Sequence, residues 1–252
     1  MSLSWPNQVR LLLSADGVRL QSTRWQQAPR TAYIPLAVSA TATIAQAVNQ
    51  VPPRRAEACH LLLADQHVHY LQLPAVQLQM SVREHAEFAR AMVVQTWGEI
   101  ARDWPIRLQA LPAWHARLLV TTPLDWQAQP ELAWQPRRWS IQPYASYLLQ
   151  QTRLPADGSL LVPEGQGVRL FHFQRGQCVH VASHLSAQAI DIEQLAGWVI
   201  RERMLISVQA QPCYWLCEPG RQDAQRLFRQ LQQQLAVELL FSDKALFQWP
   251  SA

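Results

Sequence analysis

Three histidines in the first third of the sequence have a spacing that could bind a metal ion. His60 lies in one apolar run, while His67 and His69 begin the next, with Asp65 between the runs. Because side chains alternate along a strand, His67 and His69 would share a face, and imidazole with carboxylate is a common ligand set. The simpler interpretation, a polar strand edge facing solvent, predicts no metal site. The same interpretation, a polar strand edge facing solvent, applies to three further histidines that alternate with apolar residues: His172, His180 and His184.

The cysteines and serines offer no recognisable nucleophile. The cysteines are Cys59, Cys178, Cys213 and Cys217. They form no Cys-x-x-Cys pair, have no histidine at zinc-ligand spacing and lack the basic surroundings that activate a thiol. We therefore expect reduced core cysteines, with Cys213 and Cys217 on a buried strand. No serine lies in a nucleophile-elbow frame.

Composition limits the class of protein. The chain has 252 residues, of which 49% are hydrophobic and 16% charged, and its formal net charge is +4. Lys244 is the only lysine. No basic run with interleaved aromatics is present, so nucleic-acid binding is not expected. The apolar stretches are far shorter than the roughly 20 residues of a membrane helix, and the N-terminus has no signal-peptide pattern. We expect a cytoplasmic protein.

Tryptophan is unusually frequent, with 11 in the chain. Six gather in the middle of the sequence: Trp97, Trp104, Trp114, Trp126, Trp134 and Trp139. Core packing is one interpretation. The other is an aromatic-lined groove for a protein partner, because tryptophan is enriched in interface hot spots.

Local patterns predict the elements of the first half. Apolar runs joined by Asp16-Gly17 predict a hairpin, because Asp-Gly suits the tight turns that match strand twist. Ser81 and Glu84 form a capping box before a helical stripe that ends at Gly98. The predicted strands cover 9–14, 18–25, 31–38, 59–64, 67–73 and 117–121, and the predicted helices 40–49, 82–97 and 144–153. Pro35 predicts that the third strand lies at an edge or contains a bulge, and 59–64 is expected to pair with 67–73.

The order of elements then restarts. Strands are predicted at 159–162, 168–173, 178–184, 213–217 and 237–241, and helices at 192–204 and 227–235. Each half thus reads as three strands, a helix, a strand and a helix. The prediction is an α/β protein with a duplicated fold, whose halves cover 1–153 and 154–252, each with a three-strand meander in a mixed sheet flanked by helices.

This order resembles the actin, hexokinase and Hsp70 superfamily, with its ribonuclease H-like halves. Within it, the stretch HLLLADQHVHYLQLP at 60–74 and the stretch LLVTTP at 118–123 resemble PilM-like and MshI-type pilus-assembly proteins and the cytoplasmic domain of the secretion protein GspL. The resemblance implies the actin-like fold and a place in a type IV pilus or type II secretion machine.

The resemblance also implies where a nucleotide would bind. The corresponding loop positions are Asp16 and Gly17 in the first turn, Gly165 and Gly167 in the second, and Gly220 in the adenosine loop. Active members have an Asp-x-Gly-Thr/Ser turn in each half, and this chain has neither. A phosphate cradle needs several consecutive flexible amides, which these loops do not supply. We expect no cofactor and no metal, with ATP the one candidate ligand, and expect Glu164 beside the second turn to be solvated.

The leading functional hypothesis is a non-enzymatic scaffold, peripheral to the inner membrane through a membrane-anchored partner. The partner would dock a cytoplasmic segment on the first half, around 67–73 and the capped helix. The alternatives are an ATP-binding regulatory protein of the same fold and, less favoured, a small-molecule enzyme of another α/β fold. A homodimer is compatible with the sequence.

Overall fold

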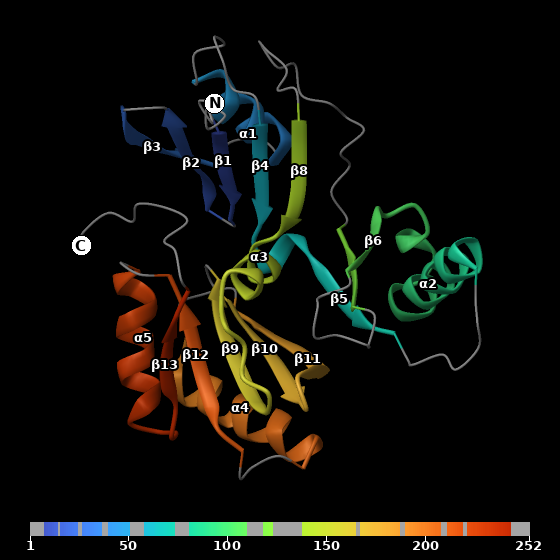
Figure 1. The fold of residues 1–252 in the computed structure, drawn as a ribbon, viewed down its shortest axis with the longest axis vertical. Helices are drawn as coiled ribbons and strands as arrows, with labels where there is room; N and C mark the ends of the chain where they lie inside the picture. The colour runs from blue at the N-terminus through green and yellow to red at the C-terminus, as the bar shows by residue number, and fades with distance from the viewer. Residues whose placement is uncertain are drawn as a thin grey trace, which may run out of the picture.

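The computed structural model describes residues 8–14, 16–24, 27–36, 40–50, 58–73, 81–109, 118–122, 138–164, 167–186, 190–207, 211–218 and 221–242. In these ranges the strands form two sheets of 5 strands and one of 3 strands. Figure 1 shows the two larger sheets one above the other, with helix α3 between them and the small sheet to one side.

The first sheet has the strand order β3-β2-β1-β4-β8. Its strands are β1 (Gln8–Leu13), β2 (Gly17–Arg24), β3 (Gln27–Pro35), β4 (Ala58–Leu63) and β8 (Arg138–Pro143). The first three form the predicted antiparallel meander, while β4 pairs in parallel with both β1 and β8. Pro35 ends the edge strand β3, where a residue without an N–H costs no ladder hydrogen bond.

The second sheet repeats this order as β11-β10-β9-β12-β13. Its strands are β9 (Gly158–Glu164), β10 (Gly167–Gln174), β11 (Gln177–Leu185), β12 (Cys213–Cys217) and β13 (Glu238–Phe241). The antiparallel and parallel pairings follow the same pattern as in the first sheet. The predicted duplication is therefore confirmed at the level of sheet topology.

Alternation along β9 explains how the second sheet joins two cores. Leu160 and Val162 face the core shared with the first sheet and α3, whereas Leu161 faces the core under helices α4 and α5. Successive side chains of a strand point to opposite faces, so one apolar run serves both cores. The helices of the two halves are α1 (Ala40–Asn49), α3 (Tyr144–Gln150), α4 (Ile192–Leu205) and α5 (Gln222–Gln232).

A small subdomain is inserted between β4 and β8. It contains the 3-10 turn η1 (Asp65–His67), β5 (His69–Gln72), α2 (Val82–Trp97), the 3-10 turn η2 (Glu99–Ala101), β6 (Ile106–Gln109) and β7 (Leu118–Thr121), with the strand order β5-β7-β6. The predicted pairing of 59–64 with 67–73 is wrong. Both edges of β4 are taken by β1 and β8, so β5 leaves the first sheet and pairs with β7.

The insertion also changes which helices are equivalent. The predicted order placed α2 in the same position as α5, but α2 belongs to the inserted subdomain. Its capping box is present, since Ser81 Oγ accepts from Glu84 N at 3.2 Å and Ser81 N donates to Glu84 Oε2 at 2.7 Å. Among the described helices, none combines the length and the apolar character needed to cross a bilayer.

Candidate functional site

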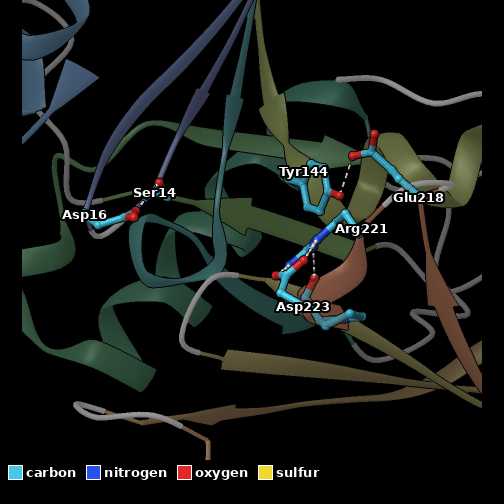
Figure 2. Close-up of polar contacts among 7 residues, drawn as sticks. Ser14, Asp16, Tyr144, Glu218, Arg221 and Asp223 are labelled. Carbon is cyan, nitrogen blue, oxygen red and sulfur yellow. Dashed lines mark hydrogen bonds and ion pairs between the residues drawn. The ribbon is translucent and has the colours of Figure 1, made fainter. Parts of the chain in front are cut away.

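The turn of the first hairpin is stabilised by contacts within the hairpin. Ser14 Oγ donates to the Asp16 carboxylate at 2.6 Å, and Ser14 N donates to the Gly17 carbonyl at 2.8 Å (Figure 2). Burial opposes ionisation of Asp16, but the hydrogen bond from Ser14 and smaller contributions from other neighbours lower its pKa below the ordinary value. The Asp16 carboxylate is therefore ionised at neutral pH and has a hydrogen-bond donor of its own chain.

Gly17 and Gly167 occupy the same place in the two halves, as the first residue of the second meander strand. A Cβ at Gly17 would lie 2.2 Å from the carbonyl oxygen of Ile34 on β3. A Cβ at Gly167 would lie 2.7 Å from Cδ2 of Leu185 and 3.0 Å from the carbonyl oxygen of His184 on β11. The close approach of the third strand therefore excludes a Cβ at Gly17, where the obstacle is backbone, and disfavours one at Gly167, where the nearest obstacle is the end of a side chain.

The second turn differs from its expected structure. Glu164 was expected to be solvated, but it is 2% exposed. Strand β9 continues through Glu164, which pairs with Gly167, so the side chain is enclosed instead of lying in a loop. Gly165 and Gly220 lie outside the described residues. A nucleotide-binding role for the five predicted loop positions stays a prediction.

A largely buried polar cluster connects the two halves, and we call it the Arg221 cluster: Tyr144, Pro163, Glu218, Arg221 and, at its rim, Asp223, whose side chain is 52% exposed. Tyr144 OH, at the start of α3, donates to Glu218 Oε1 at 2.5 Å. Arg221 Nη1 donates to the Pro163 carbonyl at the end of β9 at 2.8 Å, and Nη2 donates to Asp223 Oδ2 at 2.8 Å (Figure 2). The exposed fractions of Tyr144, Glu218 and Arg221 are 1%, 0% and 3%.

Burial determines the protonation of this cluster. Burial, followed by the negative charge of Glu218, raises the pKa of Tyr144 well above its ordinary value, and the charge of Arg221 only partly offsets this. Tyr144 is therefore a neutral hydroxyl that donates at neutral pH. Burial would raise the pKa of Asp223, but its hydrogen bond with Arg221 and the guanidinium charge lower it overall. The arrangement is suited to holding the strand ends together.

The Arg221 cluster was not predicted from the sequence. The sequence did contain a signal, because Glu218 directly follows the buried strand β12, Arg221 comes three residues after Glu218, and Tyr144 directly follows β8. Charged groups at the carboxyl ends of strands meet at one edge of an α/β sheet, which is where such folds place their functional residues. Their actual partners lie as far as 74 residues away, for Tyr144 and Glu218.

A second contact between the halves involves Arg169 on β10. Its guanidinium carbon lies 4.2 Å from the ring centroid of Tyr70, and Nη2 donates to the Val68 carbonyl at 3.4 Å. The Tyr70 ring meets Phe171 edge-on at 5.9 Å, and its hydroxyl lies 3.4 Å from Ser146 Oγ on α3. These contacts attach the start of the inserted subdomain to the second sheet and to α3.

The three histidines considered for a metal site lie in different environments. His60 Nδ1 lies 2.6 Å from Ser140 Oγ on β8, whereas His69 stacks on Trp104 with ring centroids 5.2 Å apart. His67 lies in the 3-10 turn η1, so its predicted shared strand face with His69 is wrong. The part of the chain that the structure describes contains no group of three or more metal-ligating side chains.

The second set of histidines is more enclosed than the interpretation as a polar edge predicted. His172 is 0% exposed, and its Nδ1 lies 3.1 Å from Ser159 Oγ. Burial, helped by nearby positive charge, lowers the pKa of His172 to about 4. His180 Nε2 contacts Glu202 Oε2 at 3.1 Å. His180 and His184 are half-buried and do not lie on a fully solvated face.

All four cysteines are buried and free, as predicted. Burial raises the pKa of Cys59 and Cys178 to about 12, and that of Cys213 and Cys217 to about 11. Thiols in this state are poor nucleophiles at neutral pH.

Two of the clustered tryptophans have a packing role. Trp97 and Trp104 pack against the core of the inserted subdomain. The others have no described side chain: Trp114, Trp126, Trp134 and Trp139. The aromatic-groove hypothesis therefore falls outside the described residues.

Comparison with solved structures identifies similar folds. A Bacteroides thetaiotaomicron protein of unknown function with an actin-like ATPase fold superposes with a TM-score of 0.62 at 10% identity, over 94% of this chain and 91% of that one. A chain of a PilM–PilN type IV pilus biogenesis complex gives 0.57 at 13% identity, over 92% and 88%. The cytoplasmic domain of EpsL, an inner-membrane component of the Vibrio cholerae type II secretion system, gives 0.51 at 9% identity, over 98% and 90%.

Sequence comparison gives no match to a family model or to a curated protein. At these low identities the structural similarity establishes architecture. Two observations support the same architecture. The two sheets repeat one strand order, and the structural similarity extends over nearly the whole length of both chains. The chain has the duplicated actin-like fold, in a form that resembles the matched chain of the PilM–PilN complex and the EpsL cytoplasmic domain.

Proposed function

We propose that this protein is a non-enzymatic scaffold of a type IV pilus or type II secretion assembly platform, bound to an inner-membrane partner. The observation that carries the non-enzymatic part is the Arg221 cluster. At the strand ends where the resemblance places nucleotide loops, Arg221 donates to the Pro163 carbonyl and Tyr144 donates to Glu218. The Tyr144–Glu218 hydrogen bond joins the two halves, and the side chains of Tyr144, Glu218 and Arg221 are almost completely buried.

The contacts of the described residues argue against a nucleotide and magnesium site. The hydroxyl of Ser14 is directed at the Asp16 carboxylate, which a metal-bound phosphate would need to approach. The backbone of β3 lies close to Gly17, where an added Cβ would meet the Ile34 carbonyl oxygen at 2.2 Å. The carboxylate of Glu218, with 0% exposure, accepts from Tyr144. Nucleotide binding would require these contacts to be replaced.

We expect ATP with magnesium to leave the thermal stability of the chain unchanged. A ligand at 100 times its dissociation constant would add about 2.7 kcal/mol to the free energy of unfolding, which thermal unfolding detects easily. The measurement is differential scanning fluorimetry with ATP, ADP and a non-hydrolysable analogue, alongside an ATPase assay. Stabilisation by nucleotide, or turnover that disappears in Asp16→Ala, would instead support the ATP-binding alternative.

The pilus or secretion part of the proposal is supported by the similarity in fold to a chain of the PilM–PilN complex and to the EpsL cytoplasmic domain, which belong to such machines. The proposal assigns recruitment to a membrane-anchored protein of such a machine. We place the docking surface on the inserted subdomain. It has two edge strands, β5 and β6, and strand edges can accept an extended peptide through main-chain hydrogen bonds.

The proposed docking surface also includes the exposed face of helix α2. Arg83 and Glu87 on α2 form an ion pair at 2.9 Å with side chains 88% and 65% exposed. The opposite side of the helix packs on the subdomain core through Ala89 and Val93. A cytoplasmic peptide lying along α2 would therefore meet polar, solvated side chains that are not needed for the fold.

We expect a photo-crosslinking amino acid at Ala86 or Ala91, both exposed on α2, to capture an inner-membrane pilus or secretion component in the native cell. Gln230, exposed on α5 of the second half, provides the matched control position. The captured proteins are identified by mass spectrometry. Capture from Gln230 alone, or capture of no membrane protein from any position, would contradict docking on the inserted subdomain.

A further inference from the structure

The middle of α4 contains a glycine that no contact with the described residues explains. Gly197 is exposed, and a Cβ built there would meet no other described heavy atom within 4 Å. Glycine in a helix interior costs about 1 kcal/mol relative to alanine. An alanine would therefore fit without a clash and stabilise the helix. The glycine suggests close approach of a surface that belongs to another molecule.

The surface around Gly197 is apolar for an exposed helix face. Ile200, Met204 and Leu205 are 45%, 58% and 70% exposed. With 3.6 residues per turn, positions 193, 197, 200 and 204 lie on one side of α4. The opposite side packs into the second core through Leu195 and Val199. Figure 1 shows α4 at the end of the second half that lies away from the first.

We propose that this face binds a second copy of the chain, with the two α4 helices antiparallel and crossing at Gly197. The face carries one acidic and one basic residue at equal distances on either side of Gly197, so two copies of it have complementary charges. Glu193 lies four residues before Gly197 and Arg201 four residues after it, and both are exposed. An antiparallel pair centred on Gly197 therefore places Glu193 opposite Arg201 of the partner subunit, and the reverse.

Other features of the face agree with this occupant. Two-fold symmetric dimers use the same patch on both subunits, which demands such self-complementarity. Arg201 contacts Glu202 at 3.7 Å, a long contact with the Arg201 side chain 68% exposed, so the guanidinium can also reach a partner carboxylate. A membrane surface would attract Arg201 but repel Glu193, which makes a bilayer the poorer fit.

The dimer should be weak. A contact between two helices buries much less than the about 1,600 Å² of a standard interface, so we expect a dissociation constant of about 10–100 μM. Two backbones can approach closely at a glycine crossing, because the interaxial distance depends on the side chains at the contact. A large side chain at this position would hold the helices apart.

Sedimentation velocity of the full chain over a range of concentrations tests the proposal. We expect a reversible dimer that Gly197→Leu weakens at least about tenfold, equivalent to about 1.4 kcal/mol. Leucine has the higher helix propensity, so the same variant should unfold at a higher temperature than the wild type. Glu193→Arg and Arg201→Glu should each weaken the dimer, and the double variant should restore it.

Disulfide trapping provides a second measurement. Gly197→Cys places a thiol at the two-fold axis, and we expect it to form a covalent dimer under mild oxidation, with Arg226→Cys on α5 as the exposed control. The native cysteines are buried and give little background. A dimer unaffected by Gly197→Leu would overturn the proposal. A chain that stays monomeric at several times the expected dissociation constant would also overturn it. So would a chain that binds phosphatidylglycerol vesicles in a flotation assay instead of forming a dimer.

Discussion

Arg221→Met is expected to lower the free energy of unfolding by about 3–5 kcal/mol, the cost of removing one partner from a buried charged network. Arg221 is 3% exposed and donates to the Pro163 carbonyl and to Asp223. Its removal leaves a buried carbonyl without this donor, which by itself costs about 1–3 kcal/mol. It also removes the buried cation from the surroundings of Glu218, whose exposure is 0%.

Urea denaturation provides the measurement, with a lower midpoint and an unchanged slope indicating a true loss of stability. Arg226→Met on the same helix is the matched control, because Arg226 is exposed and such changes usually stay within about 0.5 kcal/mol.

The double variant Arg221→Met with Glu218→Gln should lose less than the sum of the single losses, since the two residues belong to one network. Additive losses, or a single loss below 1 kcal/mol, would show that the cluster does not hold the halves together.

Gly17→Ala is expected to cost about 3 kcal/mol, at the upper end of the usual range for overpacking. The added Cβ would lie 2.2 Å from the carbonyl oxygen of Ile34, a backbone atom that can move only if β3 moves. Gly167→Ala should cost less, because its nearest obstacle at 2.7 Å is a terminal methyl of Leu185, which can change rotamer. Gly17→Ala should therefore lower the free energy of unfolding more than Gly167→Ala does.

The measurement is again denaturant unfolding, with Gly197→Ala as the control of opposite sign. That substitution meets no clash among the described atoms and should stabilise the chain by up to about 1 kcal/mol. A Gly17→Ala variant as stable as the wild type would show that β3 yields easily. Close packing of the meander would then not explain why position 17 is a glycine.

The features that sequence alone determined are those with local causes. The Asp16-Gly17 hairpin follows from turn chemistry, and helix α1 spans Ala40–Asn49 as predicted. The capping box at Ser81 forms because both of its hydrogen bonds lie within four residues. The restart of the meander at β9 was visible as a repeated order of apolar runs and turns, which sufficed for the fold class.

Strand partners, by contrast, were decided by the tertiary structure. Nothing in residues 59–64 distinguishes β5 from β1 and β8 as neighbours, because ladder hydrogen bonds use backbone atoms that every residue has. Strand β8 (Arg138–Pro143) escaped prediction because its sequence RWSIQP mixes polar residues with a final proline. It is a strand because the free edge of β4 pairs with it along its whole length.

Burial of charge was likewise invisible in the sequence. Glu164 was expected to be solvated and Arg221 drew no prediction, yet both lie almost completely inside the folded chain. Whether a charged side chain is buried depends on which groups reach it from distant parts of the chain. For Arg221 the Pro163 carbonyl is 58 residues away, and for Glu218 the Tyr144 hydroxyl is 74 residues away. Only folding brings these groups together, since a buried charge needs partners that local sequence does not provide.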